Sequence, residues 1–172
     1  MHNEVIEFFK EAKEKYPSFF DNKKVLEVGS LFINGSVRDL FTNCEYIGID
    51  LGPGQGVDII SKAHEYKHSN EFDVVASTEM LEHDCYWKES LAVMYENIKP
   101  GGILIFTCAG PDRAEHGTSK DNAWASPFTT DYYRNISIED FESILPKSLF
   151  SESEIKYYRG KNDLYFVGIK NI

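Results

Sequence analysis

The chain opens with apolar residues at helical spacing and then changes to short apolar runs. One face of a helix predicted over residues 1–16 carries the apolar positions from Val5 to Ala12, and Pro17 ends it. Five runs rich in branched residues follow: KVLEV, EYIGID, GVDII, FDVVAS and GILIFT. Such runs, alternating with polar or helical connectors, predict βαβ units and a parallel sheet that is buried on both faces.

The second half of the chain adds two helices and a reversed finish. The stretch YWKESLAVMYENIKPGG has apolar residues at helical spacing and ends on the strong helix terminator KPGG. Ser137 and Asp140 resemble a capping box that opens a short helix through Leu145. SEIKYYRG and DLYFVGIK follow with only a short turn between them, which predicts a terminal antiparallel hairpin.

Length and composition are those of one cytoplasmic domain. The 172 residues are interpreted as a single unit with a core at 23–109, a long loop at 110–135 and a C-terminal helix and hairpin at 136–172. Three widely spaced cysteines without a C-x-x-C motif favour a reducing compartment. The longest apolar run, ILIFTCA, is far shorter than the ~20 residues of a membrane helix, and the charged N-terminus is unlike a leader peptide.

The charge of the chain bears on its partners. Eighteen basic and twenty-eight acidic residues give a formal net charge of −10, which opposes non-specific attraction to a phosphate backbone. A nucleic acid is therefore not expected as a partner, the short apolar runs predict no membrane association, and a small molecule is the better candidate.

The first strand ends in a turn that resembles a nucleotide-binding loop and then departs from it. Gly29 follows the strand, and Asp50 ends the next strand twenty-one residues later, a distance that suits a carboxylate accepting ribose hydroxyls. Leu31 takes the place of a second glycine, and Arg38 is the only base among five acids between Val25 and Asp58. An acidic loop disfavours a pyrophosphate and favours the sulfonium and ammonium groups of S-adenosylmethionine (SAM) over NAD.

Four segments then occur in a characteristic order. KKVLEVGS, YIGIDLGPGQGVDII, FDVVASTEMLEH and IKPGGILIFT resemble the successive motifs of class I SAM-dependent methyltransferases, especially the small type-11 group. The resemblance covers residues 23–107. It implies a Rossmann-like three-layer αβα fold, mostly parallel with a C-terminal antiparallel hairpin, and SAM as the cofactor.

The same resemblance assigns cofactor contacts. It implies that Glu27, Gly29 and Ser30 line the methionine end of SAM, that Asp50 holds the ribose, and that Leu51 lies against adenine. The other expected contacts are Ala63 and His64 beside adenine, and Ser77, Thr78 and Glu79 in the loop after the fourth strand. The sequence departs from the family pattern at Leu31 and at Lys62, where relatives often have an acid for the adenine amine.

Histidines are the candidates for chemistry at the acceptor. Methyl transfer relies mainly on alignment and water exclusion, and a general base helps when the acceptor is a hydroxyl or an ammonium. His83 is the first candidate base, with a structural or surface role as the alternative, and His116 is the second. A metal site at Glu82, His83 and Asp84 lacks a separated partner motif, so no metal is predicted.

The loop at 110–135 is expected to act as a lid over the substrate. It combines apolar bulk with polar side chains, and the residues predicted to contact substrate are Arg113, Trp124, Phe128, Tyr132 and Tyr133. The alternative is that its aromatic residues only seal the sheet edge.

These features together favour one enzyme class. The sequence predicts a SAM-dependent methyltransferase that acts on a small or modest-sized acceptor, at oxygen or nitrogen. Two alternatives stay open: a module that binds SAM or its demethylated product without turnover, and a nicotinamide-dependent oxidoreductase.

Overall fold

A computed structural model describes residues 3–172, in which seven strands form one sheet in the order β3-β2-β1-β4-β5-β7-β6. The strands are β1 Lys24–Val28, β2 Glu45–Asp50, β3 Ile59–Ile60, β4 Phe72–Thr78, β5 Ile98–Ala109, β6 Phe150–Tyr158 and β7 Asp163–Lys170. The first five run parallel, whereas β7 pairs antiparallel with both β5 and β6. The predicted parallel sheet with an antiparallel terminal hairpin is therefore confirmed.

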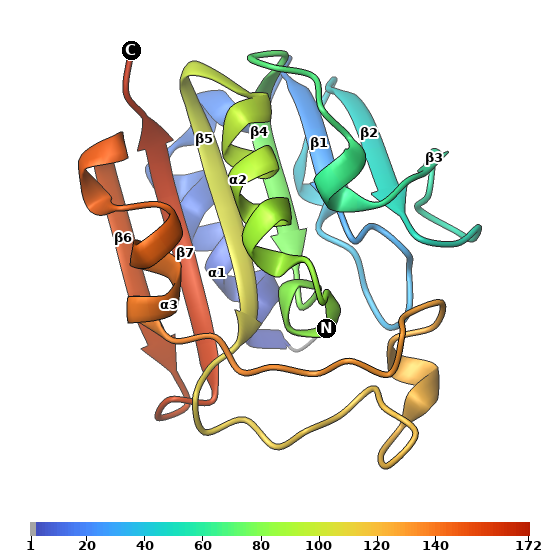
Figure 1. Cartoon of the computed structure of the whole chain (residues 1–172). Helices are drawn as coiled ribbons and strands as arrows, with labels where there is room; N and C mark the ends of the chain where they lie inside the picture. Colours follow the sequence, from blue (N-terminus) through green and yellow to red (C-terminus); the bar gives the residue numbers. More distant parts are fainter. Residues whose placement is uncertain (1–2) are drawn as a thin grey trace.

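Helices cover both faces of this sheet (Figure 1). Helix α1, Asn3–Lys15, packs its buried aromatic residues on one face together with the β-strand side chains of that face. Helices α2, Trp87–Asn97, and α3, Ile138–Ile144, pack on the opposite face. This is the expected three-layer αβα architecture. Residues 1 and 2 of the helix predicted over 1–16 lie outside the described residues.

The connections between strands differ from the predicted βαβ units. Within residues 3–172, α2 is the only α-helix that joins two parallel strands, and the other parallel connections contain no more than 3₁₀ turns at Arg38–Leu40 and Ala63–Glu65. Strand β3 is also shorter than GVDII suggested. The side chain of Asp58 accepts a hydrogen bond from the Gly48 amide at 2.7 Å, so a side chain takes over part of the strand pairing there.

The helix boundaries predicted for the C-terminal half of the chain are confirmed. Ser137 caps α3 as a capping box: its hydroxyl accepts from the Asp140 amide at 3.0 Å, and its own amide donates to the Asp140 carboxylate at 3.2 Å. Helix α2 ends at Asn97, and β5 begins at the next residue. None of the helices in the described part of the chain is long and apolar enough to cross a membrane.

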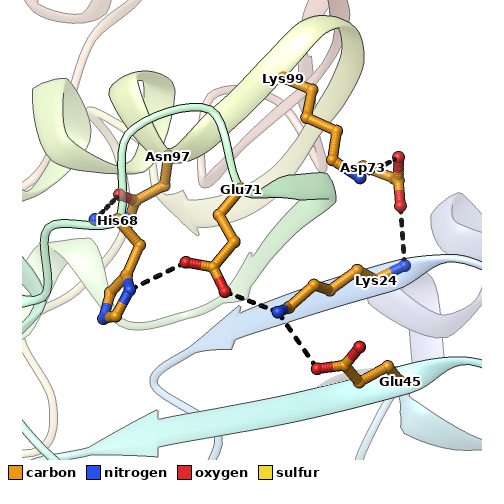
Figure 2. Close-up of polar contacts among 7 residues, drawn as sticks. All are labelled: Lys24, Glu45, His68, Glu71, Asp73, Asn97 and Lys99. Atoms are coloured by element: carbon orange, nitrogen blue, oxygen red, sulfur yellow. Dashed lines mark hydrogen bonds and ion pairs between the residues drawn. The ribbon is translucent and has the colours of Figure 1, made fainter.

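A polar network covers the amino ends of the central strands (Figure 2). Lys24 at the start of β1 contacts Glu71 at 2.6 Å and Glu45 at 3.1 Å, and its amide donates to Asp73. His68 joins this network through Glu71 at 2.9 Å. The network occupies the edge of the sheet opposite the carboxyl ends of the strands.

Candidate functional site

A cavity of about 500 Å³ lies at the carboxyl ends of β1, β2 and β4. The strand order reverses between β1 and β4, and ligands of open parallel sheets bind beyond such a reversal. The walls come from four segments: the turn after β1, the residues around the end of β2 and after β3, the segment after β4, and the lid (residues 110–135).

The turn after β1 is sharp because of one glycine. Gly29 has φ +79°, and a β-carbon there would lie 2.6 Å from Met80. The amides of Gly29 and Ser30 both donate to the Ile49 carbonyl, at 2.9 and 3.1 Å, which ties the turn to the end of β2. A side chain at position 29 would therefore disturb both walls of the cavity.

Asp50 fixes the rest of this turn. One of its carboxylate oxygens accepts from the Leu31 amide at 3.1 Å, and the other accepts from the Leu51 amide at 2.7 Å. The Leu31 amide thus donates to a carboxylate and not to a bound phosphate. A second glycine, which would let a phosphate approach the backbone, is therefore not needed at position 31. Burial raises the pKa of Asp50 and the backbone donors oppose this rise. The backbone donors of Leu31, Leu51 and Gly52 together leave this carboxylate lone-pair capacity for a ligand hydroxyl.

Glu27 is a buried acid beside the same turn. Its side chain accepts a hydrogen bond from the Tyr46 hydroxyl at 3.0 Å, and burial raises its pKa from 4.5 to about 7. Arg38 lowers this pKa, although its guanidinium pairs with Asp58 at 3.2 Å. A cationic ligand in the cavity would stabilise the ionised form of Glu27.

The cationic residues of the cavity wall are matched by acids. In the described residues these are Lys62, which pairs with Glu65 at 2.9 Å, and Arg113, which pairs with the buried Asp163 at 2.8 Å. The cavity therefore offers carboxylates to a ligand more readily than it offers positive charge.

An aromatic corner closes the cavity beyond β3. The rings of His64 and Tyr86 lie 4.2 Å apart at 37°, and both line the cavity. His64 Nδ1 is buried and has no hydrogen-bond partner among residues 3–172. A flat heterocycle with a polar edge could contact the imidazole there. The sequence carries no signal for this role of Tyr86, because the residue directly precedes the helical stripe of α2.

Ionisable side chains from two separate segments lie together at the end of the cavity opposite His64 and Tyr86. Glu82 and His83 lie in a buried 3₁₀ turn, Leu81–His83, and His116 comes from the lid. One potential ligand atom from each of the three lies within 4.8 Å of the others. The His83 and His116 rings are 5.1 Å apart and nearly perpendicular, and Tyr133 packs against both.

Burial dominates the protonation of this cluster. It lowers the pKa of His83 to about 4, with the nearby His116 as a further cause, and it lowers the pKa of His116. Burial raises the pKa of Glu82 well above 4.5, and the neighbouring Glu79 carboxylate raises it further. Both imidazoles are thus neutral at pH 7 and keep a nitrogen lone pair.

Asp84 does not join this cluster, although it follows His83 in the sequence. Its carboxylate accepts from the Tyr86 amide at 2.8 Å and from the Ser90 hydroxyl at 2.5 Å, so it organises the start of α2. The structure therefore does not assemble Glu82, His83 and Asp84, the grouping that the sequence disfavoured, and the third ionisable side chain near Glu82 and His83 is His116.

The lid reaches across the cavity to the segment after β2. The Phe128 ring approaches Gly52 so closely that a β-carbon on Gly52 would lie 2.2 Å from it. Trp124 lines the cavity and is 66% exposed. Arg113 anchors the first part of the lid to Asp163 at the start of β7. This segment is thus held at its base and contributes aromatic side chains to the cavity wall.

Comparisons with known proteins agree on the fold. No protein-family model and no curated protein matches the chain. A SAM-dependent methyltransferase from Archaeoglobus fulgidus is similar over 96% of this chain and 94% of its own, with 18% identity and a TM-score of 0.64. A phosphoethanolamine N-methyltransferase 2 from Haemonchus contortus, solved with SAM, has 16% identity and a TM-score of 0.68 over 99% of this chain. The 1,6-didemethyltoxoflavin-N1-methyltransferase of Burkholderia thailandensis, with bound substrate and S-adenosylhomocysteine, has 14% identity and a TM-score of 0.68 over 98% of this chain.

This chain has the fold of class I SAM-dependent methyltransferases. It spans 53% of the Haemonchus enzyme and 79% of the Burkholderia enzyme. The methyltransferase fold therefore accounts for the sheet order and for the position of the cavity.

Most residues that the sequence proposed for the site line the cavity of this methyltransferase fold. They are Glu27, Gly29, Ser30, Asp50, Leu51, Ala63, His64, Thr78, Glu79, His83, Arg113, His116, Trp124 and Phe128. Ser77 lies outside the lining because its buried hydroxyl donates to the Val28 carbonyl at 2.8 Å and joins β4 to β1. Tyr132 and Tyr133 also lie outside it: Tyr132 packs against the core, and the Tyr133 hydroxyl donates to the Ala114 carbonyl at 3.1 Å.

Proposed function

We propose that this protein is a SAM-dependent methyltransferase of the type-11 kind, with the whole chain 1–172 working as a single domain on a small or modest-sized acceptor. The observation that carries the proposal is the pair of carboxylates, Glu27 and Asp50, that flanks the turn after β1 inside the cavity. An acidic wall there suits a ligand with a sulfonium and an ammonium and is unfavourable for a pyrophosphate.

The cofactor would lie along the ends of β1, β2 and β4. The methionine end would contact Glu27, Gly29 and Ser30, and Asp50 would accept the ribose hydroxyls with its remaining lone pairs. Leu51, Ala63 and His64 would border adenine. With Lys62 paired to Glu65, His64 Nδ1 is the polar atom best supported as a contact for the adenine edge.

The acceptor would occupy the end of the cavity near His83 and His116, under the lid. A cavity of about 500 Å³ falls in the range of small-molecule sites, and the net charge of −10 disfavours nucleic acid. The neutral His83 ring supports transfer to oxygen or nitrogen, because its lone pair can take a proton from the acceptor or bind another group there.

A binding module without turnover is the second candidate. It is favoured by the three backbone amides, of Leu31, Leu51 and Gly52, that already bond to the Asp50 carboxylate, because a ribose must share these oxygens. A screen for transfer of isotope-labelled methyl groups to small acceptors separates an enzyme from a binder.

Calorimetric titration with SAM, S-adenosylhomocysteine and NAD tests the ligand. We expect both adenosyl sulfur compounds to bind and NAD to bind more weakly or not at all. Asp50→Ala should weaken SAM binding about 5- to 150-fold, which corresponds to the ~1–3 kcal/mol of a lost charged hydrogen-bond partner. Asp39→Ala removes an exposed acid from the same β1–β2 connection and should leave the affinity unchanged. Tighter binding of NAD than of SAM would replace this proposal with an oxidoreductase.

A further inference from the structure

Three side chains at the acceptor end have the composition of a metal site. Glu82, His83 and His116 bring one carboxylate and two imidazoles together, with one potential ligand atom from each within 4.8 Å of the others. Glu82 is 0% exposed and His83 is 7% exposed, so two of the three are buried. His116 comes from the lid, thirty-three residues after His83, and supplies the separated partner that the local motif lacks.

The lone pairs of this cluster are available for a ligand. Glu82 uses Oε1 to accept from the Ala109 amide at 3.2 Å, whereas its buried Oε2 has no hydrogen-bond partner in the described chain. His83 Nδ1 is also buried without a partner among those residues. His116 places Nδ1 at 3.0 Å from the Ala114 carbonyl; because a carbonyl only accepts, Nδ1 carries the proton and Nε2 keeps its lone pair.

This bonding pattern is typical of metal-binding histidines. A ligating histidine commonly donates its other ring N–H to a backbone carbonyl, which fixes the tautomer and the ring orientation, as at His116. Buried polar atoms are normally paired, so unpaired atoms on two residues of the same cluster call for an occupant. A metal cation would satisfy both atoms at once.

We propose that Glu82, His83 and His116 form a binding site for a divalent first-row transition-metal ion at the acceptor end of the cavity. Two imidazoles and one carboxylate suit ions such as Mn²⁺, Fe²⁺, Co²⁺ or Zn²⁺ better than Mg²⁺ or Ca²⁺, which prefer oxygen ligands. Ligand atoms about 2 Å from a tetrahedral ion lie ~3.3 Å apart, so the cluster must contract. The lid position of His116 makes it the residue that moves.

The site gives the proposed transfer a specific chemistry, and this step rests on the proposed function. Three protein ligands leave coordination positions open for an acceptor hydroxyl, whose pKa falls when the oxygen binds the ion. The hydroxyl proton passes to water, the oxygen lone pair attacks the methyl carbon of SAM, and the carbon–sulfur bond breaks with its electron pair remaining on sulfur. The products are a methyl ether and S-adenosylhomocysteine. A metal-bound His83 ring could not serve as the general base, so the ion takes over that role.

Metal binding can be measured directly on tag-free protein that has been treated with a chelator and then freed of it. We expect Co²⁺ to bind at one equivalent by calorimetry and to give visible d–d absorption, and Mg²⁺ to bind far more weakly. His116→Ala is the main variant because this side chain lies in the lid and not in the core. It should weaken Co²⁺ binding at least ~10-fold. Glu82→Gln, which keeps an acceptor for the Ala109 amide, should do the same.

His68→Ala is the matched control. His68 is a half-exposed histidine that pairs with Glu71 at the opposite edge of the sheet (Figure 2). It should leave Co²⁺ binding unchanged. Wild-type protein that binds no Co²⁺, or that binds it as well after His116→Ala as before, would overturn the proposal.

A parallel titration with SAM keeps this result separate from the proposed function. SAM binding without Co²⁺ binding rejects the metal site and leaves the methyltransferase proposal intact. Co²⁺ binding that depends on His116, without SAM binding, supports the metal site and rejects the cofactor assignment.

Discussion

Glu27→Gln should stabilise the ligand-free protein in a manner that depends on pH. Glu27 is almost fully buried, and its pKa rises from 4.5 to about 7 on folding because burial penalises the carboxylate. Between these two values the folded chain holds a proton that the unfolded chain has released. The free energy of unfolding therefore falls as pH increases from 4.5 to about 7, and it is level above that.

The size of the effect follows from the same two pKa values. A rise from 4.5 to about 7 corresponds to about 3 kcal/mol of lost stability at high pH. Glutamine is neutral, has nearly the same shape and can accept the Tyr46 hydroxyl hydrogen bond. We expect Glu27→Gln to be more stable than the wild type by up to about 3 kcal/mol at pH 8.5, and by less than about 1 kcal/mol at pH 5.

Urea unfolding of both proteins at pH 5, 6, 7 and 8.5 measures this difference. Carboxylates remote from Glu27 titrate equally in the two proteins, so the difference in unfolding free energy reports mainly on Glu27 and on its interaction with Asp50 and Asp58. Glu14→Gln, which removes an exposed acid from α1, should follow the wild type at every pH. A constant difference between Glu27→Gln and the wild type across this range would refute the reasoning that burial controls the charge of Glu27.

Two further predictions concern ligand binding and turnover. SAM affinity of the wild type should increase as pH rises through about 7, because a cationic ligand favours the ionised carboxylate of Glu27. This increase should be absent in Glu27→Gln. Calorimetry over pH 5.5–8.5 measures the affinity of both proteins. His83→Ala should leave SAM affinity nearly unchanged and lower turnover by roughly 10²–10⁴ once an acceptor is identified, because it removes either the proton acceptor or a ligand of the proposed metal ion. Normal turnover of His83→Ala across pH would leave the His83 ring a packing role only.

The parts of the fold that the sequence predicted are those with local causes. Strands β1, β2 and β4 are short runs rich in branched apolar residues. Their last residues fix where Gly29 and Asp50 lie, since parallel strands end on one edge of a sheet. The capping box at Ser137 depends on residues three apart and was equally accessible. The predicted helical crossovers before β4 were wrong because alternation alone does not separate a helix from a loop with 3₁₀ turns.

The parts that were missed depend on distant contacts. His116 joins Glu82 and His83 only because the lid folds back over the cavity, and no local pattern encodes that path. Asp84 adjoins His83 in sequence, yet the Ser90 hydroxyl and the Tyr86 amide hold it at the start of α2. Ser77 likewise lies near the end of β4, but its hydroxyl donates to the Val28 carbonyl of β1 and so does not face a ligand.

A crystal structure with S-adenosylhomocysteine tests the central claim most directly. The account predicts ribose hydroxyls within hydrogen-bond distance of the Asp50 carboxylate, the amino acid end beside Glu27 and the turn at Gly29, and adenine near Leu51 and His64. The sulfur would then face His83 and His116, where the acceptor must lie. A ligand bound elsewhere, or bound in this cavity with its ribose away from Asp50, would contradict the account.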